Sequence, residues 1–182
     1  MRRVGWWILI LVILSDLAVA RWWWIQRRER RYNPQIVEAA RRYGIDPALV
    51  KAVVWKESAF NPLARGLAGE IGLMQVRTLA AQEWAQTEKL PTPSPLALED
   101  PQTNTFIGAW YLAKLIKRYR QTDNPVAYAL ADYNAGRSNV LRWKTGGGST
   151  NHSEFIQNIT FPSTASYIRM VQERQTRYQT RF

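Results

Sequence analysis

The chain has 182 residues, which is enough for one domain of about 150 residues and a short extension. It contains no cysteine and one histidine, which excludes a disulfide framework and a thiolate nucleophile and disfavours a zinc site of the usual His/Cys type. The net charge of +11 favours an anionic partner, but the chain lacks a clear basic helix or interleaved aromatic residues for nucleic-acid binding. Carboxylates, hydroxyls and amides remain for any chemistry, and we expect no metal, no cofactor and no nucleic-acid partner.

Residues 1–31 differ in composition from the rest of the chain, because seven of them are arginine and only two are acidic. Two apolar runs, Trp6–Leu14 and Leu17–Ala20, lie between the basic ends. A membrane anchor would span about Val4 to Ile25, with tryptophans at both membrane interfaces. A signal peptide would begin at the charged start and end at a cleavage site formed by Ala18-Val19-Ala20.

We favour the membrane anchor over the signal peptide. Asp16 costs about 2.5–3.5 kcal/mol on the insertion scale, and the Ile, Leu and Val residues, at about 0.3–0.6 kcal/mol each, offset that cost. The run Trp22–Trp24 suits a membrane interface better than a mature N-terminus. A helix packed on the domain is a third interpretation. We therefore divide the chain into residues 1–31, an anchor or signal segment with a basic juxtamembrane stretch, and residues 32–182, a globular domain.

The globular part contains repeated helix start signals. Proline suits the first turn of a helix, and it occurs there in Asn33-Pro34, Asp46-Pro47, Asp100-Pro101 and Asn124-Pro125. We expect helices over residues 33–43, 47–57, 78–87, 101–120 and 124–136, a shorter one around 140–141, and a last one from 163 or 164 to about 181. No stretch alternates convincingly as a strand does. The sequence predicts a nearly all-α domain.

Glu57 follows a strongly apolar segment, Ala48–Trp55, and Asn61-Pro62 then stops the regular structure. A carboxyl group at such a boundary lies between a low-dielectric core and a cleft. That setting raises its pKa towards neutrality and suits it to act as a general acid. A lone glutamate at a helix end is usually solvated, so the interpretation depends on the rest of the chain.

Four separated stretches support the chemical interpretation of Glu57. They are Glu57–Pro62, Gly72–Gln75, Ala131–Gly136 and Ser163–Ile168. Together they resemble the lytic transglycosylases of the soluble-lytic-transglycosylase catalytic-domain type, which share the goose-type lysozyme fold. The central motif of that family is matched by Asp100-Pro101, Asn104, Gly108 and Tyr111-Leu112. The resemblance covers roughly residues 34–172 and implies a mostly α, lysozyme-like catalytic domain.

The resemblance implies cleavage of the β-1,4 bond between N-acetylmuramic acid and N-acetylglucosamine in peptidoglycan. No water is added, and the product ends in 1,6-anhydromuramic acid. Glu57 would protonate the glycosidic oxygen as the single general acid and then accept the proton of the C6 hydroxyl as that oxygen attacks the anomeric carbon. The N-acetyl group of the substrate would help to stabilise the oxocarbenium-like centre.

The same matching implies a set of substrate-binding residues. Met74 and Gln75 would line the sugar cleft, and the Tyr133 phenol or the Asn134 amide would orient Glu57. Ser58 would bind substrate or hold the loop beside the acid, with a helix cap as its structural alternative. Met74 could instead fill the core, and Tyr133 could be a buried ring. The full expected set is Ser58, Met74, Gln75, Tyr133, Asn134 and Tyr167.

The chain departs from the family pattern at several positions. Ser163 stands where the family usually has Glu, and Ala165 replaces a common Arg, from which we expect altered contacts near the cleft floor. Glu70 replaces a small residue, and we expect it to be an exposed loop carboxylate. We expect Asp132 to face solvent. A lysozyme-like hydrolase that uses Glu70 or Asp132 as a second carboxylate remains an alternative, and so does a non-catalytic cell-wall glycan-binding protein.

Because peptidoglycan lies outside the cytoplasmic membrane, the resemblance implies a location in the bacterial cell envelope. We expect the domain outside, anchored through the N-terminal helix, or exported after signal cleavage. The arginine count alone would place the domain in the cytoplasm. The expected partners are peptidoglycan glycan strands and the membrane.

Overall fold

A computed structural model describes residues 2–180, without the side chains of residues 2–5, 7–11 and 22. Its contacts divide the chain into two units, Met1–Asn33 and Pro34–Phe182. The described residues contain no β-strand, and only two isolated antiparallel bridges occur, Arg65 with Ile71 and Ile71 with Val76. The predicted mostly helical architecture is confirmed.

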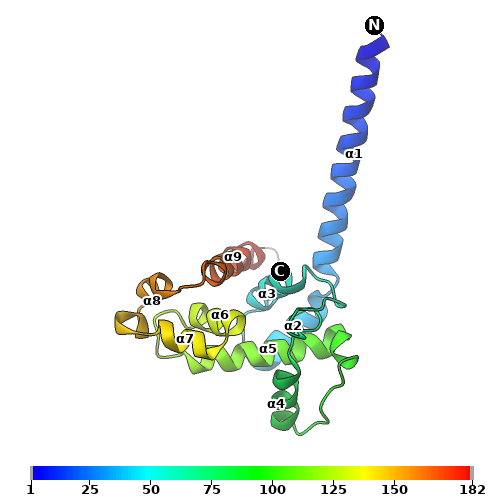
Figure 1. Cartoon of the computed structure of the whole chain (residues 1–182). Coiled ribbons are helices and arrows are strands. Elements are labelled where there is room, and N and C mark those ends of the chain that lie inside the picture. The colour runs from blue at the N-terminus through cyan, green and yellow to red at the C-terminus, as the bar shows by residue number, and fades with distance from the viewer. Residues whose placement is uncertain (1, 181–182) are drawn as a thin grey trace. The chain divides into compact units, whose positions relative to one another are not determined.

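The first unit contains one helix, α1 (Arg2–Arg30) (Figure 1). The guanidinium groups of Arg27 and Arg28 lie over the rings of Trp23 and Trp24, 5.2 and 5.1 Å from the ring centroids. The expected membrane span, from about Val4 to Ile25, falls partly on side chains outside the described residues. Among those that are described, no helix is long and apolar enough to cross a membrane.

The second unit consists of helices joined by loops (Figure 1). The α-helices are α2 (Asn33–Tyr43), α3 (Pro47–Ser58), α4 (Thr78–Glu88), α5 (Pro101–Arg118), α6 (Pro125–Ala135), α7 (Arg137–Trp143), α8 (His152–Asn158) and α9 (Pro162–Gln179). Two 3-10 helices, η1 (Ala97–Glu99) and η2 (Gly146–Ser149), join them. The sequence did not predict α8, because only Phe155 of this short helix is buried and an apolar periodicity is therefore missing.

The helix α3 is largely buried and ends beside the candidate acid, Glu57. Asp46 caps its N-terminus by accepting a hydrogen bond from the Ala48 amide, and Pro47 occupies the first turn. All residues from Ala48 to Val54 are buried. Valine has a modest intrinsic helix propensity, so burial, rather than propensity, stabilises α3.

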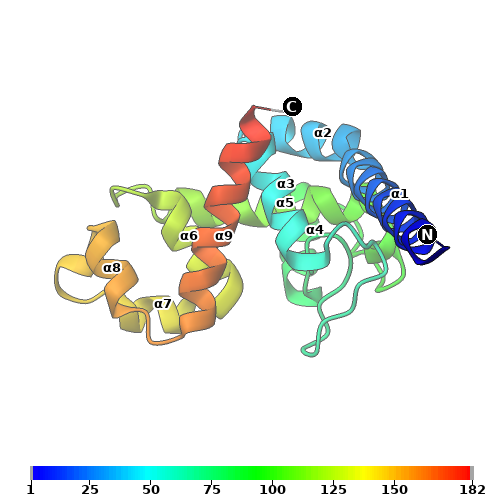
Figure 2. The same cartoon turned by 90° about the horizontal axis from the view of Figure 1, so that it is seen from above.

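The helix α9 packs along α3, and the two lie side by side in both ribbon views (Figures 1 and 2). Polar contacts hold the C-terminal half of α9 to the start of α3, because Gln175 and Gln179 each donate a hydrogen bond to Asp46 Oδ2 at 2.8 Å. The Arg174 guanidinium also lies 4.0 Å from the Trp55 ring centroid. These contacts fix α9 relative to the C-terminal end of α3.

The chain turns sharply directly after α3. Ala59 and Phe60 both have left-handed backbone geometry, with φ of 47° and 64°. Such a conformation costs roughly 1–2 kcal/mol for a residue with a side chain. Phe60 is only 2 % exposed, so burial of its ring offsets the cost. The turn leaves Glu57 at the end of a rigid, buried helix.

Asn104 on α5 anchors the loop that follows this turn. Its amide nitrogen donates hydrogen bonds to the carbonyls of Ile71 and Leu98, and its Oδ1 accepts one from the Met74 amide, all at 2.8 Å. The side chain is fully buried. A Cβ on Gly72, which has φ of 81°, would collide with Asn104, so glycine is required there.

We predict that Asn104→Ala destabilises the domain by about 3 kcal/mol, because two buried carbonyls and one buried N–H lose their partners. Thermal and denaturant unfolding of both proteins measure the effect. Gln102→Ala on the same helix is the control, since Gln102 is exposed and donates a single hydrogen bond to Glu38. That control should change stability by at most about 0.5 kcal/mol. Equal losses in the two variants would contradict the anchoring role of Asn104.

Candidate active site

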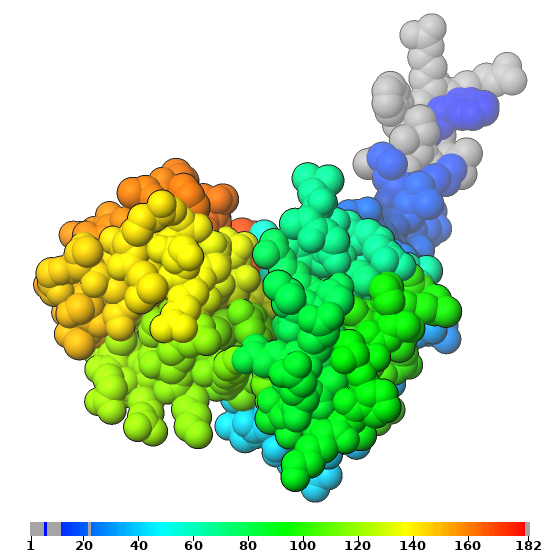
Figure 3. Space-filling model, turned by 60° about the horizontal axis from the view of Figure 1, so that its bottom comes forward, coloured from blue at the N-terminus to red at the C-terminus, as the bar shows by residue number. Residues whose placement is uncertain are grey.

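A cleft of about 450 Å³ opens beside the end of α3. In Figure 3 this cleft appears as a hollow. The green surface on one side of it comes from residues before about 105, and the yellow surface on the other comes from residues of about 120 to 150. Its walls come from the end of α3, the loop before α4, the start of α4, α5 and the end of α6. The lining residues are Glu57, Glu70, Gln75, Val76, Arg77, Leu79, Ala80, Gly108, Tyr111, Asp132, Tyr133, Asn134, Ala135 and Gly136.

Glu57 lies in this cleft with its carboxyl group mostly shielded from water. Burial raises the pKa of this carboxyl from 4.5 to about 7. A hydrogen bond from Tyr167 and the charge of Lys56 oppose the shift, and the negative charge of Glu70 adds slightly to it. Near neutral pH, Glu57 therefore holds a proton for a substantial fraction of the time and can act as either an acid or a base.

Tyr167 on α9 is the hydrogen-bond partner of Glu57. Its hydroxyl donates to Glu57 Oε1 at 2.6 Å, and its ring is only 3 % exposed. This hydrogen bond favours the ionised carboxylate and fixes its direction. From the sequence we expect Tyr133 or Asn134 to orient Glu57, but Tyr167 makes this hydrogen bond, because α9 packs along α3.

Tyr133 and Asn134 line the cleft from α6 but make other hydrogen bonds. Tyr133 donates its hydroxyl proton to the carbonyl of Met74 at 2.6 Å. Asn134 Oδ1 accepts a hydrogen bond from the buried Thr164 at 2.9 Å. Burial, with a further contribution from Glu57, raises the pKa of Tyr133 well above 10, so its phenol stays neutral. Both residues thus connect the α6 wall to neighbouring segments.

The remaining expected residues lie on the loop beside Glu57 or at the end of α3. Gln75 lines the cleft, with φ of 48°, and its amide donates to the carbonyls of Ala64 and Gly72. Met74 is fully buried beneath Gly108 and is not among the lining residues. Ser58 also lies outside the lining and directs its hydroxyl to the carbonyls of Val54 and Leu73. Ser58 thereby joins the end of α3 to the loop.

Two acidic residues lie in the cleft walls besides Glu57. Glu70 is more enclosed than expected, with 19 % of its side chain exposed, and it forms an ion pair with Arg77 at 2.6 Å. Hydrogen bonds from Arg77 and from backbone amides lower its pKa despite some desolvation. The expectation that Asp132 faces solvent is wrong, since it is 2 % exposed. Arg118 and Tyr119 donate hydrogen bonds to Asp132 Oδ2 at 2.7 and 2.6 Å.

Several lining residues were not expected from the sequence. Tyr111 belongs to the α5 motif, and its ring centroid lies 5.7 Å from that of Tyr133. Arg77 directly follows the Gly72–Val76 loop, but an arginine at this position did not by itself indicate a place in the cleft wall.

Ser163 and Ala165, which depart from the family pattern, do not line the cleft: Ser163 is exposed and Ala165 is half-buried. In the described part of the chain, no cluster of three or more acidic or histidine side chains forms a metal site.

The model of the family described as Transglycosylase SLT domain matches residues 34–156, and the chain belongs to this family. It is 37 % identical over 124 residues to membrane-bound lytic murein transglycosylase C of Shigella sonnei, and 40 % identical over 124 residues to the Haemophilus influenzae protein of that name. These alignments cover 65 % of this chain but 34 % and 35 % of the relatives. The chain thus spans about a third of their length.

Solved lytic transglycosylases have a similar fold. The 70-kDa soluble enzyme of Escherichia coli superposes with a TM-score of 0.73 at 28 % identity, over 82 % of this chain and 24 % of that one. An inactive Glu-to-Gln mutant of Slt from Pseudomonas aeruginosa gives 0.73 at 27 % identity, over 81 % and 24 %. A complex of the 70-kDa soluble lytic transglycosylase with bulgecin A gives 0.75 at 26 %, over 92 % and 27 %. The resemblance predicted from the motifs is confirmed.

The raised pKa of Glu57 predicts a pH-dependent loss of stability. Because folded Glu57 binds its proton more tightly than unfolded Glu57, its contribution is complete below pH 4.5 and is lost as the pH rises towards 7. Glu57→Gln removes this loss. The variant should match the wild type near about pH 4 and exceed it by about 2–3 kcal/mol near about pH 8.

Urea unfolding at several pH values measures this difference. Glu70→Gln is the control, because the pKa of Glu70 is lowered and the expected change has the opposite sign. A stability difference between Glu57→Gln and the wild type that does not change with pH would contradict a raised pKa for Glu57.

Proposed function

We propose that residues 32–182 form the catalytic domain of a peptidoglycan lytic transglycosylase. It cleaves the β-1,4 bond between N-acetylmuramic acid and N-acetylglucosamine without water and leaves 1,6-anhydromuramic acid ends. The main support is Glu57, a carboxyl with a pKa of about 7 in the cleft. The names of the matched relatives are consistent with this activity.

In the proposed reaction, protonated Glu57 donates its proton to the glycosidic oxygen as the bond from that oxygen to the anomeric carbon breaks. The resulting carboxylate then accepts the proton of the C6 hydroxyl while the C6 oxygen bonds to the same carbon. The proton count balances, and water is not consumed. A pKa near the operating pH suits a group that must give and take a proton in turn.

The surroundings of Glu57 suit both steps. Burial stabilises the protonated form before the first transfer, and the Tyr167 hydroxyl stabilises the carboxylate formed by it. We propose that Gln75, Tyr133 and Asn134, which line the cleft, contact the sugar chain. We propose that Ser58, Met74 and Tyr167 support the geometry of this site from behind the lining residues.

The state of the other carboxylates favours the transglycosylase over the hydrolase. A hydrolase needs a second carboxylate that is free to activate water. Asp132 Oδ2 accepts two hydrogen bonds, and its Oδ1 is buried. Glu70 accepts hydrogen bonds on both oxygens, from Arg77 and from the Ala68 amide. We therefore assign the acid and base steps to Glu57 alone.

We predict that the chain converts purified peptidoglycan into anhydromuramyl products and that Glu57→Gln lowers the rate at least about 100-fold, because general acid–base catalysis supplies that much. Mass spectrometry of the products measures both. Glu99→Gln, which removes the partner of Arg65 outside the cleft lining, should retain the rate. Reducing muramic acid ends would instead indicate hydrolysis, and binding without cleavage would indicate a glycan-binding protein.

We further propose that residues 1–31 attach the domain to the cytoplasmic membrane, with the domain on the outer side. Supporting features are the exposed apolar side chains between Val12 and Val19 and the pairing of Trp23 and Trp24 with arginines, an arrangement typical of membrane interfaces. The name of the matched relatives describes those proteins as membrane-bound. A location in the cell envelope agrees with the proposed substrate.

This attachment predicts that the full chain sediments with membranes and resists carbonate extraction, whereas residues 34–182 stay in the supernatant. Burial of the exposed apolar side chains of α1 in the membrane would supply the difference in affinity. Intact-mass analysis of the membrane fraction identifies the N-terminus. A protein that begins at Arg21 would show signal cleavage and would contradict a retained anchor.

A further inference from the structure

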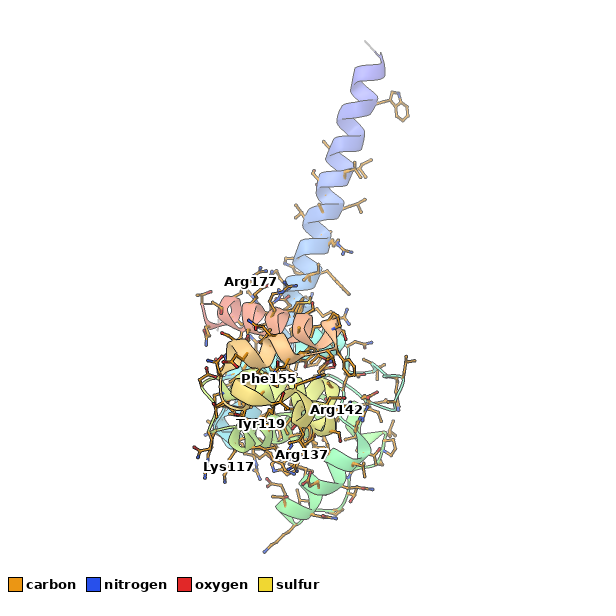
Figure 4. The ribbon with its side chains drawn as sticks, turned by 60° about the vertical axis from the view of Figure 1, so that its left-hand side comes forward. Lys117, Tyr119, Arg137, Arg142, Phe155 and Arg177 are labelled. Carbon is orange, nitrogen blue, oxygen red and sulfur yellow. The ribbon has the colours of Figure 1, made fainter. Side chains whose placement is uncertain are left out.

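Arg77 holds a distinctive position in the cleft. Among the lining residues in the described part of the chain, it has the only positively charged side chain. Lys117 of α5 and Arg137 and Arg142 of α7, which Figure 4 labels, are not in the lining. Any anionic group that enters the cleft therefore has one cationic partner in its walls.

The fold presents the Arg77 guanidinium in a defined orientation. The bridge between Ile71 and Val76 brings the flanking residues Glu70 and Arg77 together. Arg77 Nε and Nη2 donate to Glu70 Oε1 at 2.8 and 2.6 Å. Glu70 Oε2 in turn accepts a hydrogen bond from the Ala68 amide, so the carboxylate is fixed by the loop.

Part of the guanidinium remains available for a ligand. A guanidinium group has five N–H donors, and Glu70 uses two of them. The edge formed by Nη1 and the second hydrogen of Nη2 has no hydrogen-bond partner within the described residues. The Arg77 side chain is 62 % exposed, compared with 19 % for Glu70. The two N–H groups of this edge can donate parallel hydrogen bonds to both oxygens of one carboxylate.

From this geometry, and on the basis of the function proposed above, we propose that Arg77 is a specificity-determining residue that binds a carboxylate of the peptidoglycan strand. Glu70 is its positioning residue. Two parts of the substrate can supply the carboxylate. One is the peptide stem, and the other is the lactyl group of muramic acid, which is free only where the stem is absent.

A purely structural role is the competing explanation, because an ion pair beside the Ile71–Val76 bridge also stabilises the loop. Arg65 and Glu99 provide the comparison. Their side chains are 53 % and 21 % exposed, close to the values for Arg77 and Glu70, but neither lines the cleft. Arg65→Gln therefore removes a similar charge and a similar ion pair outside the cleft lining.

The test compares cleavage by the full chain of native strands and of strands whose carboxyl groups have been converted to amides. The wild type should have a kcat/KM about three- to tenfold higher on native strands, as expected for an exposed charge-assisted contact. Arg77→Gln should bring this ratio close to one through KM. Arg77→Lys should keep part of the preference, because lysine keeps the positive charge but cannot donate two parallel hydrogen bonds as the planar guanidinium does.

Arg65→Gln should keep the wild-type ratio. A ratio that Arg77→Gln leaves unchanged, or that Arg65→Gln lowers equally, overturns the proposal. If Arg77→Gln cleaves neither strand, binding is measured instead of cleavage. The ratio of the affinities for native and amidated strands is then compared between Glu57→Gln and the double variant Glu57→Gln/Arg77→Gln. A wild type that cleaves neither strand would instead overturn the proposed function.

A third substrate identifies the source of the carboxylate. Strands stripped of their stems by an amidase have free lactyl carboxylates, and their own amidated form is the reference. If the wild type, but not Arg77→Gln, prefers the stripped strands over their amidated form, the contact is with the lactyl group. Loss of the preference on stripped strands assigns it to the peptide stem.

Discussion

The desolvation of one carboxyl group is the constraint on which the rest of this domain depends. Glu57 ends a helix whose preceding residues, Ala48–Val54, are all buried, so its carboxyl lies where water is scarce. A pKa of about 7 follows from that placement. The placement needs a long apolar helix, a sharp turn directly after it and a second helix close enough to supply Tyr167. Each of these features is built by a different part of the chain.

The supporting structure around Glu57 is a connected set of hydrogen bonds rather than a collection of separate contacts. Ser58 joins α3 to the loop, Asn104 joins the loop to α5, and Tyr133 joins α6 to the same loop through the Met74 carbonyl. Buried polar groups of this kind are stable only when each has its partners. The consequence is that the end of α3, the loop before α4, α5 and α6 are held in fixed positions around Glu57.

Among the described residues, Glu57 is the one carboxylate in the cleft lining that does not form an ion pair with an arginine. Asp132 and Glu70 are both near the cleft, but each is engaged by an arginine, Arg118 and Arg77 respectively. Hydrogen bonds from Arg77 and backbone amides hold the pKa of Glu70 below its usual value, whereas burial raises the pKa of Glu57. The proposed contact with a substrate carboxylate uses the edge of Arg77 that this pairing leaves without a partner among the described residues. The excess of positive charge in the whole chain does not by itself predict this site.

The sequence by itself determined the helical class, most helix bounds, the family and the position of Glu57 at a helix end, because proline starts, apolar runs and short motifs are local features. It did not predict the tyrosine that contacts Glu57, since the motifs favoured Tyr133 or Asn134 and only the packing of α9 against α3 brings Tyr167 there. It also misplaced Asp132, which is buried against Arg118 and Tyr119 at the C-terminal end of α5. Only the tertiary structure decided these contacts, because they join residues far apart in the chain through side-chain directions that no local pattern specifies.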